Sequence, residues 1–359
     1  MKEHIAIVGA GNGGQAFAGY LSLMGEHIKI FDVFPATVEK LNEVGGVLME
    51  GNSKYKGFGK IELASTNMKD VIEGAKLILI VLPSLYHADM ARQMAPYLKD
   101  GQVIVLNPHA SMGPVEFKNV LNECGVTADV TIGCTSTLLF ACRAVEIGKV
   151  VVAGQKQHLF ASAYPSSRNQ ILVDMFKDIL PEFEVVDDVI RTSLENINAY
   201  VHPAPSILNT GRIESGTPFE YYLDCTPAQG RYIDALDKER MALAAAYGLD
   251  HKMKMLVEEY KAMYRCHGDN MYEILTSNED LKGIRGQKSL DTRYIMEDVP
   301  CSLVALQSLG KIAGVPTPCI DAMITVARTL LPHMIEGRTV KNLGLEGVSK
   351  EEFIKMCRG

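Results

Sequence analysis

The stretch HIAIVGAGNGG, at residues 4–14, decides the fold of this chain. It begins with the apolar run Ile5–Val8, which is typical of a strand that is buried on both faces. Gly9, Gly11 and Gly14 then follow with the spacing G-x-G-x-x-G. In a dinucleotide-binding turn, the first glycine permits the tight bend, the second lets a pyrophosphate approach the backbone, and the third allows close helix packing. The stretch therefore predicts a strand, a phosphate-binding turn and a helix.

An acidic residue follows the second expected strand. Asp32 comes directly after Ile28–Phe31, and an acid at this point of a dinucleotide-binding fold hydrogen-bonds the adenosine ribose. A surface aspartate that caps a loop would explain Asp32 alone, but not the strand, glycines, helix and acid together. Val33 and not a basic residue comes next, so a 2′-phosphate would meet a carboxylate without an adjacent cation. This favours NAD(H) over NADP(H), although basic residues elsewhere in the chain leave NADP(H) open.

Residues 1–187 alternate short apolar runs with stretches of helical spacing. The expected strands are 5–8, 28–31, 77–81, 103–106, 130–132 and 150–152. The alternation predicts an α/β fold, a doubly wound parallel Rossmann sheet with helices on both faces. Ligands of such sheets lie beyond the carboxyl ends of the strands, although prolines there also suit a plain turn. The residues expected to contact the cofactor are Gly9, Gly11, Asn12, Gly13, Gly14, Asp32, Leu82, Pro83, Asn107 and Pro108.

The pattern changes at about residue 188, where strand-like runs end and periodic apolar stripes dominate. Thr226 and Thr317 each precede a proline, so each predicts a helix N-cap with proline at the first helical position. Gly248 is expected just after the end of the first of these helices. We therefore expect an all-α second domain at residues 188–359.

One histidine of the second domain has an informative context. The segment ENINAYVHPAP, at residues 195–205, sets His202 directly before Pro203. Proline interrupts a helix, so His202 is expected at a kink or helix end, where a side chain can be directed into a cleft. An imidazole that titrates near neutral pH suits general acid–base work on a carbonyl or imine. Without further support, a surface or core histidine is the more common outcome.

A second segment, DTRYIMEDVP at residues 291–300, combines an arginine with an acidic pair. Glu297 and Asp298 can serve simply as negative charges near a helix N-terminus. Alternatively, an aspartate that is hydrogen-bonded to a histidine fixes the tautomer of the ring and stabilises the imidazolium. Arg293 has the fork geometry that pairs with a substrate carboxylate.

The composition argues against several classes of function. The 359 residues carry 36 Lys and Arg against 43 Asp and Glu, a net charge of -7, whereas a nucleic-acid surface needs concentrated positive charge. The eight cysteines form no CxxC pair and no zinc-ligand cluster, so no metal is expected. The most apolar stretch, residues 77–82, is far shorter than the about 20 residues of a membrane helix, and the N-terminal residues show no signal-peptide pattern. We expect a cytoplasmic protein without a membrane partner.

Three segments together resemble a known family. They are GAGNGGQAFAGYL at residues 9–21, ENINAYVHPAPSILNTGRIESGTPFEYY at residues 195–222 and DTRYIMEDVP at residues 291–300. They resemble the opine dehydrogenases, the octopine/nopaline dehydrogenase family, and within it the bacterial N-(1-carboxyethyl)norvaline dehydrogenase type. The resemblance covers essentially the whole chain. The glycine motif is common to many proteins, whereas the His-Pro segment and the R-Y-x-x-E-D segment are specific to this family.

The resemblance implies an NAD(P)H-dependent reductive condensation of an L-amino acid with a 2-keto acid, commonly pyruvate, to an N-(carboxyalkyl)amino acid. It implies that His202 is the catalytic acid/base, that Asp298 is its partner, and that Arg293 binds the keto-acid carboxylate. Thr137 and Asn198 are implied as further substrate contacts. The amino acid, the keto acid, the physiological direction and the oligomeric state stay open, although an apolar face of the helical domain suits a homodimer.

Two other kinds of function stay open. Glycerol-3-phosphate dehydrogenase, ketopantoate reductase and 6-phosphogluconate dehydrogenase share the expected architecture but use a lysine of the second domain as proton donor. Residues 178–237 of this chain contain no lysine, so a 2-hydroxy acid dehydrogenase that uses His202 is the stronger alternative enzyme. The other alternative is a non-enzymatic dinucleotide sensor, which has no need to bring His202, Arg293 and Asp298 together.

Overall fold

The computed structural model describes residues 3–359, and its contacts divide the chain into two compact units. Unit 1 contains the chain up to His109 and residues 113–192 and 356–359, whereas unit 2 contains residues 110–112 and 193–355. The boundary between the main segments of the two units therefore lies between Thr192 and Ser193. The domain ranges expected from the sequence, 1–187 and 188–359, stay a prediction.

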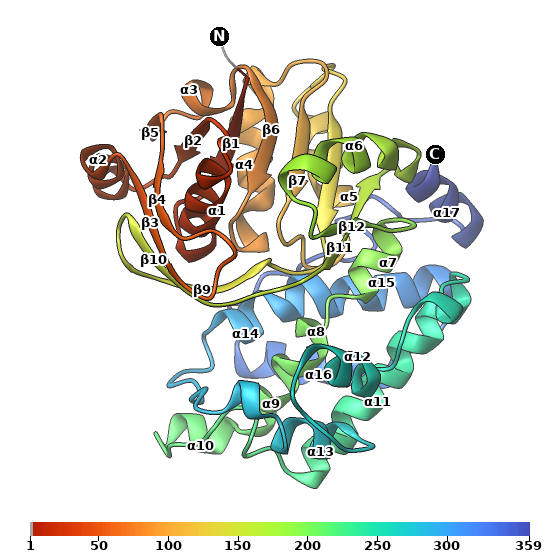
Figure 1. Ribbon diagram of the computed structural model, residues 1–359. Coiled ribbons are helices and arrows are strands. Elements are labelled where there is room, and N and C mark those ends of the chain that lie inside the picture. The colour runs from red at the N-terminus through yellow and green to blue at the C-terminus, as the bar shows by residue number, and fades with distance from the viewer. Residues whose placement is uncertain (1–2) are drawn as a thin grey trace. The chain divides into compact units, whose positions relative to one another are not determined.

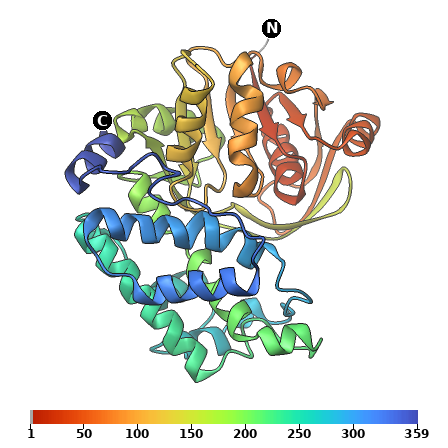
Figure 2. The same cartoon turned by 180° about the vertical axis from the view of Figure 1, so that it is seen from behind.

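The main sheet of unit 1 has eight strands in the order β12-β11-β8-β7-β6-β1-β2-β5 (Figure 1). Their bounds are β1 His4–Val8, β2 Ile28–Phe31, β5 Leu63–Ser65, β6 Ala75–Ile80, β7 Val103–Leu106, β8 Thr131–Thr135, β11 Leu159–Tyr164 and β12 Phe183–Val185. All neighbouring strands run parallel except β8 and β11. Helix α1 (Asn12–Leu23) lies on one face, and α4 (His87–Met94) and α5 (Gly113–Glu123) lie on the other (Figures 1 and 2). The expected doubly wound sheet is confirmed.

A second, four-stranded sheet corrects one expectation. Its order is β4-β3-β10-β9, with bounds β3 Gly46–Gly51, β4 Gly57–Lys60, β9 Phe140–Glu146 and β10 Lys149–Gln155. The run 150–152, expected in the main sheet, lies in β10, which pairs parallel with β3 and antiparallel with β9. Val150 and Val152 are buried while Val151 between them is partly exposed. The prediction was wrong because three consecutive valines do not reveal that only one face of the strand is covered.

Helix α1 is buried along most of its length because it contacts both sheets. Its residues from Gly14 to Leu21 are all buried. The ring of Phe17 packs edge-on against Phe140 of β9, with 5.0 Å between the centroids. The helix that starts at the glycine motif is therefore fixed by the core of unit 1, which holds its N-terminus in place.

Unit 2 is built from helices, and none of the strands described for residues 3–359 lies in it. The helices that bear on the site are α8 Asn198–Val201, α9 Pro203–Leu208, α11 Pro227–Ala246, α14 Arg293–Met296, a π turn η6 Val299–Leu303, α15 Val304–Ala313 and α16 Pro318–Leu330. The expected all-α second part of the chain is confirmed. Other helices of the chain are α2 Pro35–Val44, α3 Met68–Ile72, α6 Asn169–Ile179, α7 Val189–Leu194, α10 Thr210–Glu214, α12 Leu256–Met263, α13 Met271–Thr276 and α17 Lys350–Arg358.

The two expected N-caps differ in the structure. Thr226 caps α11 with a capping box, in which its hydroxyl accepts from Gln229 N and the Gln229 side chain accepts from Thr226 N. Gly248 follows the helix with a φ of 71°, as expected. Thr317 is the N-cap residue of α16 and Pro318 is the first residue of that helix, as expected. Unlike Thr226, it makes no side-chain cap bond, and its hydroxyl lies 3.1 Å from the Asp321 carboxylate.

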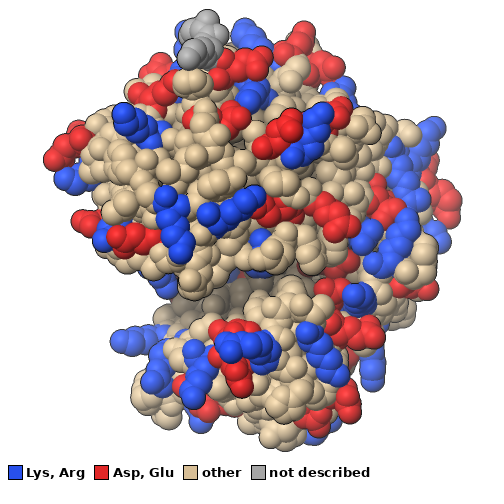
Figure 3. Space-filling view, in the orientation of Figure 1, with Lys and Arg blue, Asp and Glu red and all other residues tan. Residues whose placement is uncertain are grey.

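On the face shown in Figure 3, Lys and Arg side chains are interspersed with Asp and Glu over both units. Within residues 3–359, no helix combines the length and the apolar character that crossing a bilayer requires.

Candidate active site

The glycine loop between β1 and α1 has the geometry of a ligand turn. Gly9 adopts a φ of 107°, which only glycine adopts readily. A Cβ on Gly14 would lie 1.7 Å from the Gly9 carbonyl oxygen, so a side chain there cannot fit. A Cβ on Gly11 would meet no atom within 4 Å. The loop is therefore tightly packed at its first and third glycines and open at its second, as a pyrophosphate at a helix N-terminus requires. Asn12 and Gly13 follow at the start of α1.

Asp32 is tied to this loop. Its Oδ2 accepts a hydrogen bond from Ala10 N at 2.7 Å, and its Oδ1 accepts one from Phe34 N at 3.0 Å. The side chains of Val33 and Phe34 beside it are largely exposed. Asp32 thus fixes the glycine loop to the end of β2, a role that the sequence did not suggest, and each carboxylate oxygen keeps a second lone pair for a ribose hydroxyl.

Two further strand ends carry residues expected to contact the cofactor. The Leu82 side chain occupies the space next to Gly9, within 2.6 Å of where a Cβ would be, and Pro83 follows it. Asn107 is buried at the end of β7, and Pro108 comes next. The Asn107 Oδ1 accepts from Thr135 at 3.0 Å, whereas its Nδ2 has no hydrogen-bond partner among residues 3–359. A buried donor without a partner is costly, so an acceptor on a ligand would satisfy it.

Thr137 belongs to the same part of unit 1 as Asn107. The Thr135 hydroxyl lies 3.0 Å from Asn107 Oδ1 and 3.1 Å from the Thr137 carbonyl oxygen. Thr137 itself is half-buried. The expected substrate contact therefore lies close to one of the expected cofactor contacts.

His202 lies where the sequence predicts it, between two short helices of unit 2. It follows α8 and precedes α9, whose first residue is Pro203. Its Nδ1 is 2.8 Å from Asp298 Oδ2. The side chains are 14% and 11% exposed, respectively. The bond to Asp298 leaves Nε2 as the ring nitrogen that can exchange a proton with a substrate.

The ring is held by more than the carboxylate. It stacks on Tyr294, with 3.9 Å between centroids and 5° between planes. The His202 carbonyl oxygen accepts from Ser206 Oγ at 2.9 Å and from the Tyr221 hydroxyl. These contacts fix both the ring plane and the backbone of His202. The side chain therefore loses little conformational entropy when a substrate binds.

Burial dominates the electrostatics of Asp298. It raises the pKa of this carboxyl above its ordinary value, and the hydrogen bond with His202 opposes that shift. A buried carboxylate needs such a partner, because an unpaired charge at this depth would be costly. The hydrogen bond with His202 therefore helps to keep the buried Asp298 carboxylate charged.

Arg293 lies on α14 beside this pair and is 69% exposed. Its Nε donates to Glu297 Oε2 at 2.8 Å. Burial lowers the pKa of Arg293, but Glu297 and Asp298 outweigh burial and raise it. Its two terminal nitrogens have no hydrogen-bond partner within residues 3–359, which leaves the fork available for a carboxylate. Asn198 begins α8, one turn before His202, and its carbonyl oxygen accepts from His202 N at 3.0 Å.

Sequence reasoning missed Tyr294 and Tyr221. Tyr294 occupies the Y of the quoted R-Y-x-x-E-D segment, four residues before Asp298, and residues with this spacing share a helix face. That spacing was the signal that could have found it. Tyr221 had no such signal, because its contact with His202 joins different elements.

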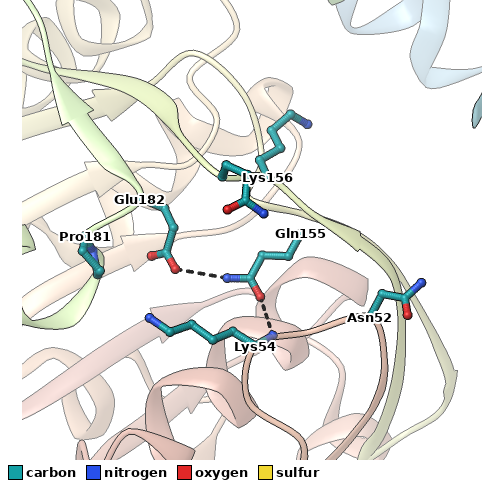
Figure 4. Close-up of a pocket in the computed structure, with 7 residues that line it drawn as sticks. Asn52, Lys54, Gln155, Lys156, Pro181 and Glu182 are labelled. Atoms are coloured by element: carbon teal, nitrogen blue, oxygen red, sulfur yellow. Dashed lines mark hydrogen bonds between the residues drawn. The ribbon is translucent and has the colours of Figure 1, made fainter. Parts of the chain in front are cut away.

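Outside these residues, unit 1 has a polar cavity of about 460 Å³. Figure 4 shows the Gln155 side chain bridging the Lys54 backbone and the Glu182 carboxylate. The Tyr20 hydroxyl also donates to Glu182, at 2.8 Å, so these groups connect α1 with β10 of the small sheet and with the residue directly before β12 of the main sheet. No group of three or more His, Cys, Asp or Glu side chains within residues 3–359 has a metal-binding arrangement.

Comparison with known proteins identifies the family. Residues 185–331 match the model for the α-helical domain of NAD/NADP octopine/nopaline dehydrogenase, and residues 4–109 match the N-terminus of NAD-dependent glycerol-3-phosphate dehydrogenase. An opine dehydrogenase of Arthrobacter sp. (strain 1C) is 38% identical over 347 residues, which cover 96% of each chain. The chain belongs to the opine dehydrogenase family. It is an NAD(P)-dependent oxidoreductase of the kind that acts on CH–NH donors and condenses an amino acid with a 2-keto acid.

Solved structures show the same fold. An octopine dehydrogenase described with NADH and L-arginine has a TM-score of 0.82 at 21% identity, and covers 100% of this chain and 99% of its own. A yersinopine dehydrogenase described with NADP+ has a TM-score of 0.71 at 14% identity, with 96% and 93% covered. A ketopantoate reductase from Ralstonia eutropha follows at 0.62 and 18% identity, with 92% and 99% covered. The expected family, fold class and reaction type of the opine dehydrogenases are confirmed.

Proposed function

We propose that this chain uses NADH to condense the amino group of an L-amino acid with pyruvate or a similar short 2-keto acid. The product would be an N-(carboxyalkyl)amino acid. The hydrogen bond of 2.8 Å between His202 and Asp298 carries the proposal, because it orients a largely buried imidazole for proton transfer. Membership in the opine dehydrogenase family supplies the reaction class for that imidazole.

His202 is the acid/base of this proposal. Its Nε2 takes a proton from the substrate ammonium, so that the free amine can add to the keto carbon. A proton of the adduct nitrogen then moves to the former keto oxygen, which becomes a hydroxyl. The imidazolium then donates its proton to the hydroxyl of the adduct, which leaves as water and gives a protonated imine. Asp298 orients the ring and stabilises the imidazolium between these two steps. When bound, the reduced nicotinamide supplies the electron pair and hydrogen that convert the imine carbon to an amine carbon.

Arg293 is the proposed partner of the keto-acid carboxylate. Its free terminal nitrogens support this role, and its Nε bond to Glu297 holds the guanidinium at the site. Thr137 and Asn198 are proposed as further polar contacts of the substrates. Both are half-buried, as residues at the wall of a site are.

Replacing Arg293 by methionine is expected to raise the KM for the keto acid about 10- to 100-fold, the effect of losing a charged hydrogen-bond pair. The KM for NADH should change less than about twofold, since no cofactor contact is assigned to this residue. Initial rates with each substrate varied in turn measure this. Arg231→Met, an exposed arginine of α11 in the same unit, is the control and should behave like the parent. An equal rise in the KM for NADH would contradict the assignment.

We propose that the cofactor is NAD(H), held by Gly9, Gly11, Asn12, Gly13, Gly14 and Asp32, with Leu82, Pro83, Asn107 and Pro108 at the strand ends beside them. The Asp32 carboxylate supports this preference, because it would repel a 2′-phosphate and no basic residue follows it directly.

Asp32→Asn is expected to lower the ratio of the KM for NADPH to the KM for NADH about tenfold. This is the scale of one removed repulsion between unit charges. Asparagine keeps an acceptor for Ala10 N or Phe34 N, so the loop should stay folded. Glu184→Gln removes the same charge from β12, at the opposite side of the main sheet from β2, and should leave the ratio unchanged. An unchanged ratio in Asp32→Asn would show that Asp32 does not select the cofactor.

A substrate screen tests the proposed function. The enzyme is assayed for NADH oxidation with twenty L-amino acids against pyruvate and glyoxylate, and then with each keto acid alone. We expect oxidation that requires the amine. Oxidation with a keto acid alone would favour the 2-hydroxy acid dehydrogenase, and tight NADH binding without oxidation in any combination would favour the dinucleotide sensor.

A further inference from the structure

The helix that carries Asp298 is irregular directly after this residue. Val299–Leu303 forms the π turn η6, in which Val304 N bonds to the Val299 carbonyl oxygen five residues earlier. Pro300 also lacks an N–H to donate. A π turn costs regular helix bonds and occurs often at functional sites. Its shape therefore decides which way Asp298, the residue at its start, is directed.

A distant segment of unit 2 holds this turn. Arg338 is 1% exposed, and its Nη1 donates to the Cys301 carbonyl oxygen at 3.2 Å and to the Ser111 carbonyl oxygen at 2.7 Å. Its backbone N donates to the Pro300 carbonyl oxygen at 3.0 Å. Ser111 N in turn donates to Cys301 at 3.2 Å. One buried arginine thus satisfies carbonyl groups of two consecutive residues of the turn.

The preceding glycine touches the turn directly. Gly337 has a φ of 80°, and a Cβ on it would lie 2.2 Å from the Pro300 carbonyl oxygen. Only a residue without a side chain lets the two backbones approach this closely. The contact lies two residues from Asp298, so a shift of Pro300 would act on the backbone close to this carboxylate.

The histidine segment contacts the same turn. Asn196 Nδ2 donates to Ser302 Oγ at 2.9 Å, and both side chains are buried. The elements that carry His202 and Asp298 are therefore joined twice, once through this bond and once through the imidazole and carboxylate themselves. The first connection reaches the π turn at Ser302, and the second reaches Asp298, the residue directly before the turn.

We propose that Gly337 and Arg338 form a positioning element for the His202–Asp298 pair. They fix the π turn, and the turn directs the Asp298 carboxylate at Nδ1 of His202. The effect of this element on turnover rests on the proposed function, whereas its effect on the geometry of the pair does not. Neither residue is assigned a contact with a substrate or with the cofactor.

Gly337→Ala is the central variant, because it pushes on Pro300 without removing a polar group. Its kcat is expected to fall about 10- to 100-fold, as small displacements of reacting groups do, with the KM for NADH unchanged within about twofold. Gly347→Ala is the matched control. Gly347 has a φ of 75°, so alanine there suffers the same backbone strain, but a Cβ on it would meet nothing within 4 Å. The control should keep its kcat within about twofold of the parent.

Two measurements separate positioning from a general loss of stability. In an Asp298→Asn background, Gly337→Ala should lower kcat less than about twofold further, because effects that act through one residue are not additive. The downfield proton NMR signal of the imidazole in the Asp298 hydrogen bond, assigned by its loss in Asp298→Asn, should move or vanish in Gly337→Ala and persist in Gly347→Ala. Arg338→Lys should show the same pattern, and thermal unfolding checks that each variant is folded.

The proposal is overturned if Gly337→Ala and Gly347→Ala have equal kcat values, if the loss in Gly337→Ala persists in full in the Asp298→Asn background, or if the NMR signal is unmoved. The NMR signal reports the pair whether or not the enzyme condenses amines. A moved signal in a protein without amine-dependent activity would therefore support the positioning element while it contradicts the proposed function.

Discussion

His202→Ala is expected to lower kcat for amine-dependent NADH oxidation by about 10²- to 10⁴-fold, the range of a lost general acid/base. The 2.8 Å bond to Asp298 engages Nδ1 of His202 and leaves Nε2 for proton exchange with the substrates. Without it, neither the substrate ammonium nor the departing hydroxyl has a positioned proton acceptor or donor. Steady-state rates with saturating amino acid and keto acid measure the loss.

Binding of NADH by His202→Ala separates this role from a cofactor contact. The change in nicotinamide fluorescence on binding should give a Kd equal to that of the parent, since the proposed cofactor contacts all lie in unit 1. His251→Ala, which removes an exposed histidine of unit 2, is the control and should keep full activity. If His202→Ala no longer binds NADH, the residue belongs to the cofactor site and the acid/base assignment is wrong.

Asp298→Asn is expected to lower kcat by about 10²- to 10³-fold, because the ring keeps its place but loses its fixed tautomer and the charge that stabilises the imidazolium. The KM for NADH should stay within about twofold of the parent value. The comparison variant is Glu297→Gln, which keeps the hydrogen-bonding shape next to Arg293 but leaves Asp298 intact. It should affect the KM for the keto acid more than kcat.

The pH profile adds a second readout for Asp298. Because burial raises the pKa of this carboxyl, it is protonated at a higher pH than an ordinary aspartate as the pH falls. The negative charge that stabilises the imidazolium is then lost. Activity of the parent should therefore decline on the acid side through this group, and the decline due to it should be absent in Asp298→Asn. A preserved kcat with a raised KM for NADH would contradict the pairing.

The glycine loop between β1 and α1 was predictable because its constraints are local. Gly9 needs a positive φ and Gly14 needs room against the Gly9 carbonyl, and both requirements appear within eleven residues of sequence. The second role of Asp32, as an anchor for Ala10, could not be predicted. Every residue except proline has a backbone N–H, so the identity of residue 10 does not indicate this hydrogen bond.

The contact between His202 and Asp298 was predictable in part. The proline neighbour of His202 predicted its position at a helix end, but its pairing with Asp298, 96 residues later, came from the resemblance to the opine dehydrogenases and not from periodicity or spacing. The π turn and its contact with Arg338 were out of reach, because no local pattern announces an arginine that bonds to distant carbonyl groups. The small sheet around β10 was missed because covered and uncovered faces cannot be told apart in a short run of valines.

One isotope experiment tests the central claim most directly. The enzyme is supplied with pyruvate, a ¹⁵N-labelled amino acid taken from the screen, and NADH that carries deuterium at the transferred position. We predict a single secondary amine whose mass contains both labels, with the deuterium on the carbon that was the keto carbon of pyruvate, and His202→Ala should form almost none of it. Deuterated lactate without ¹⁵N would contradict the account.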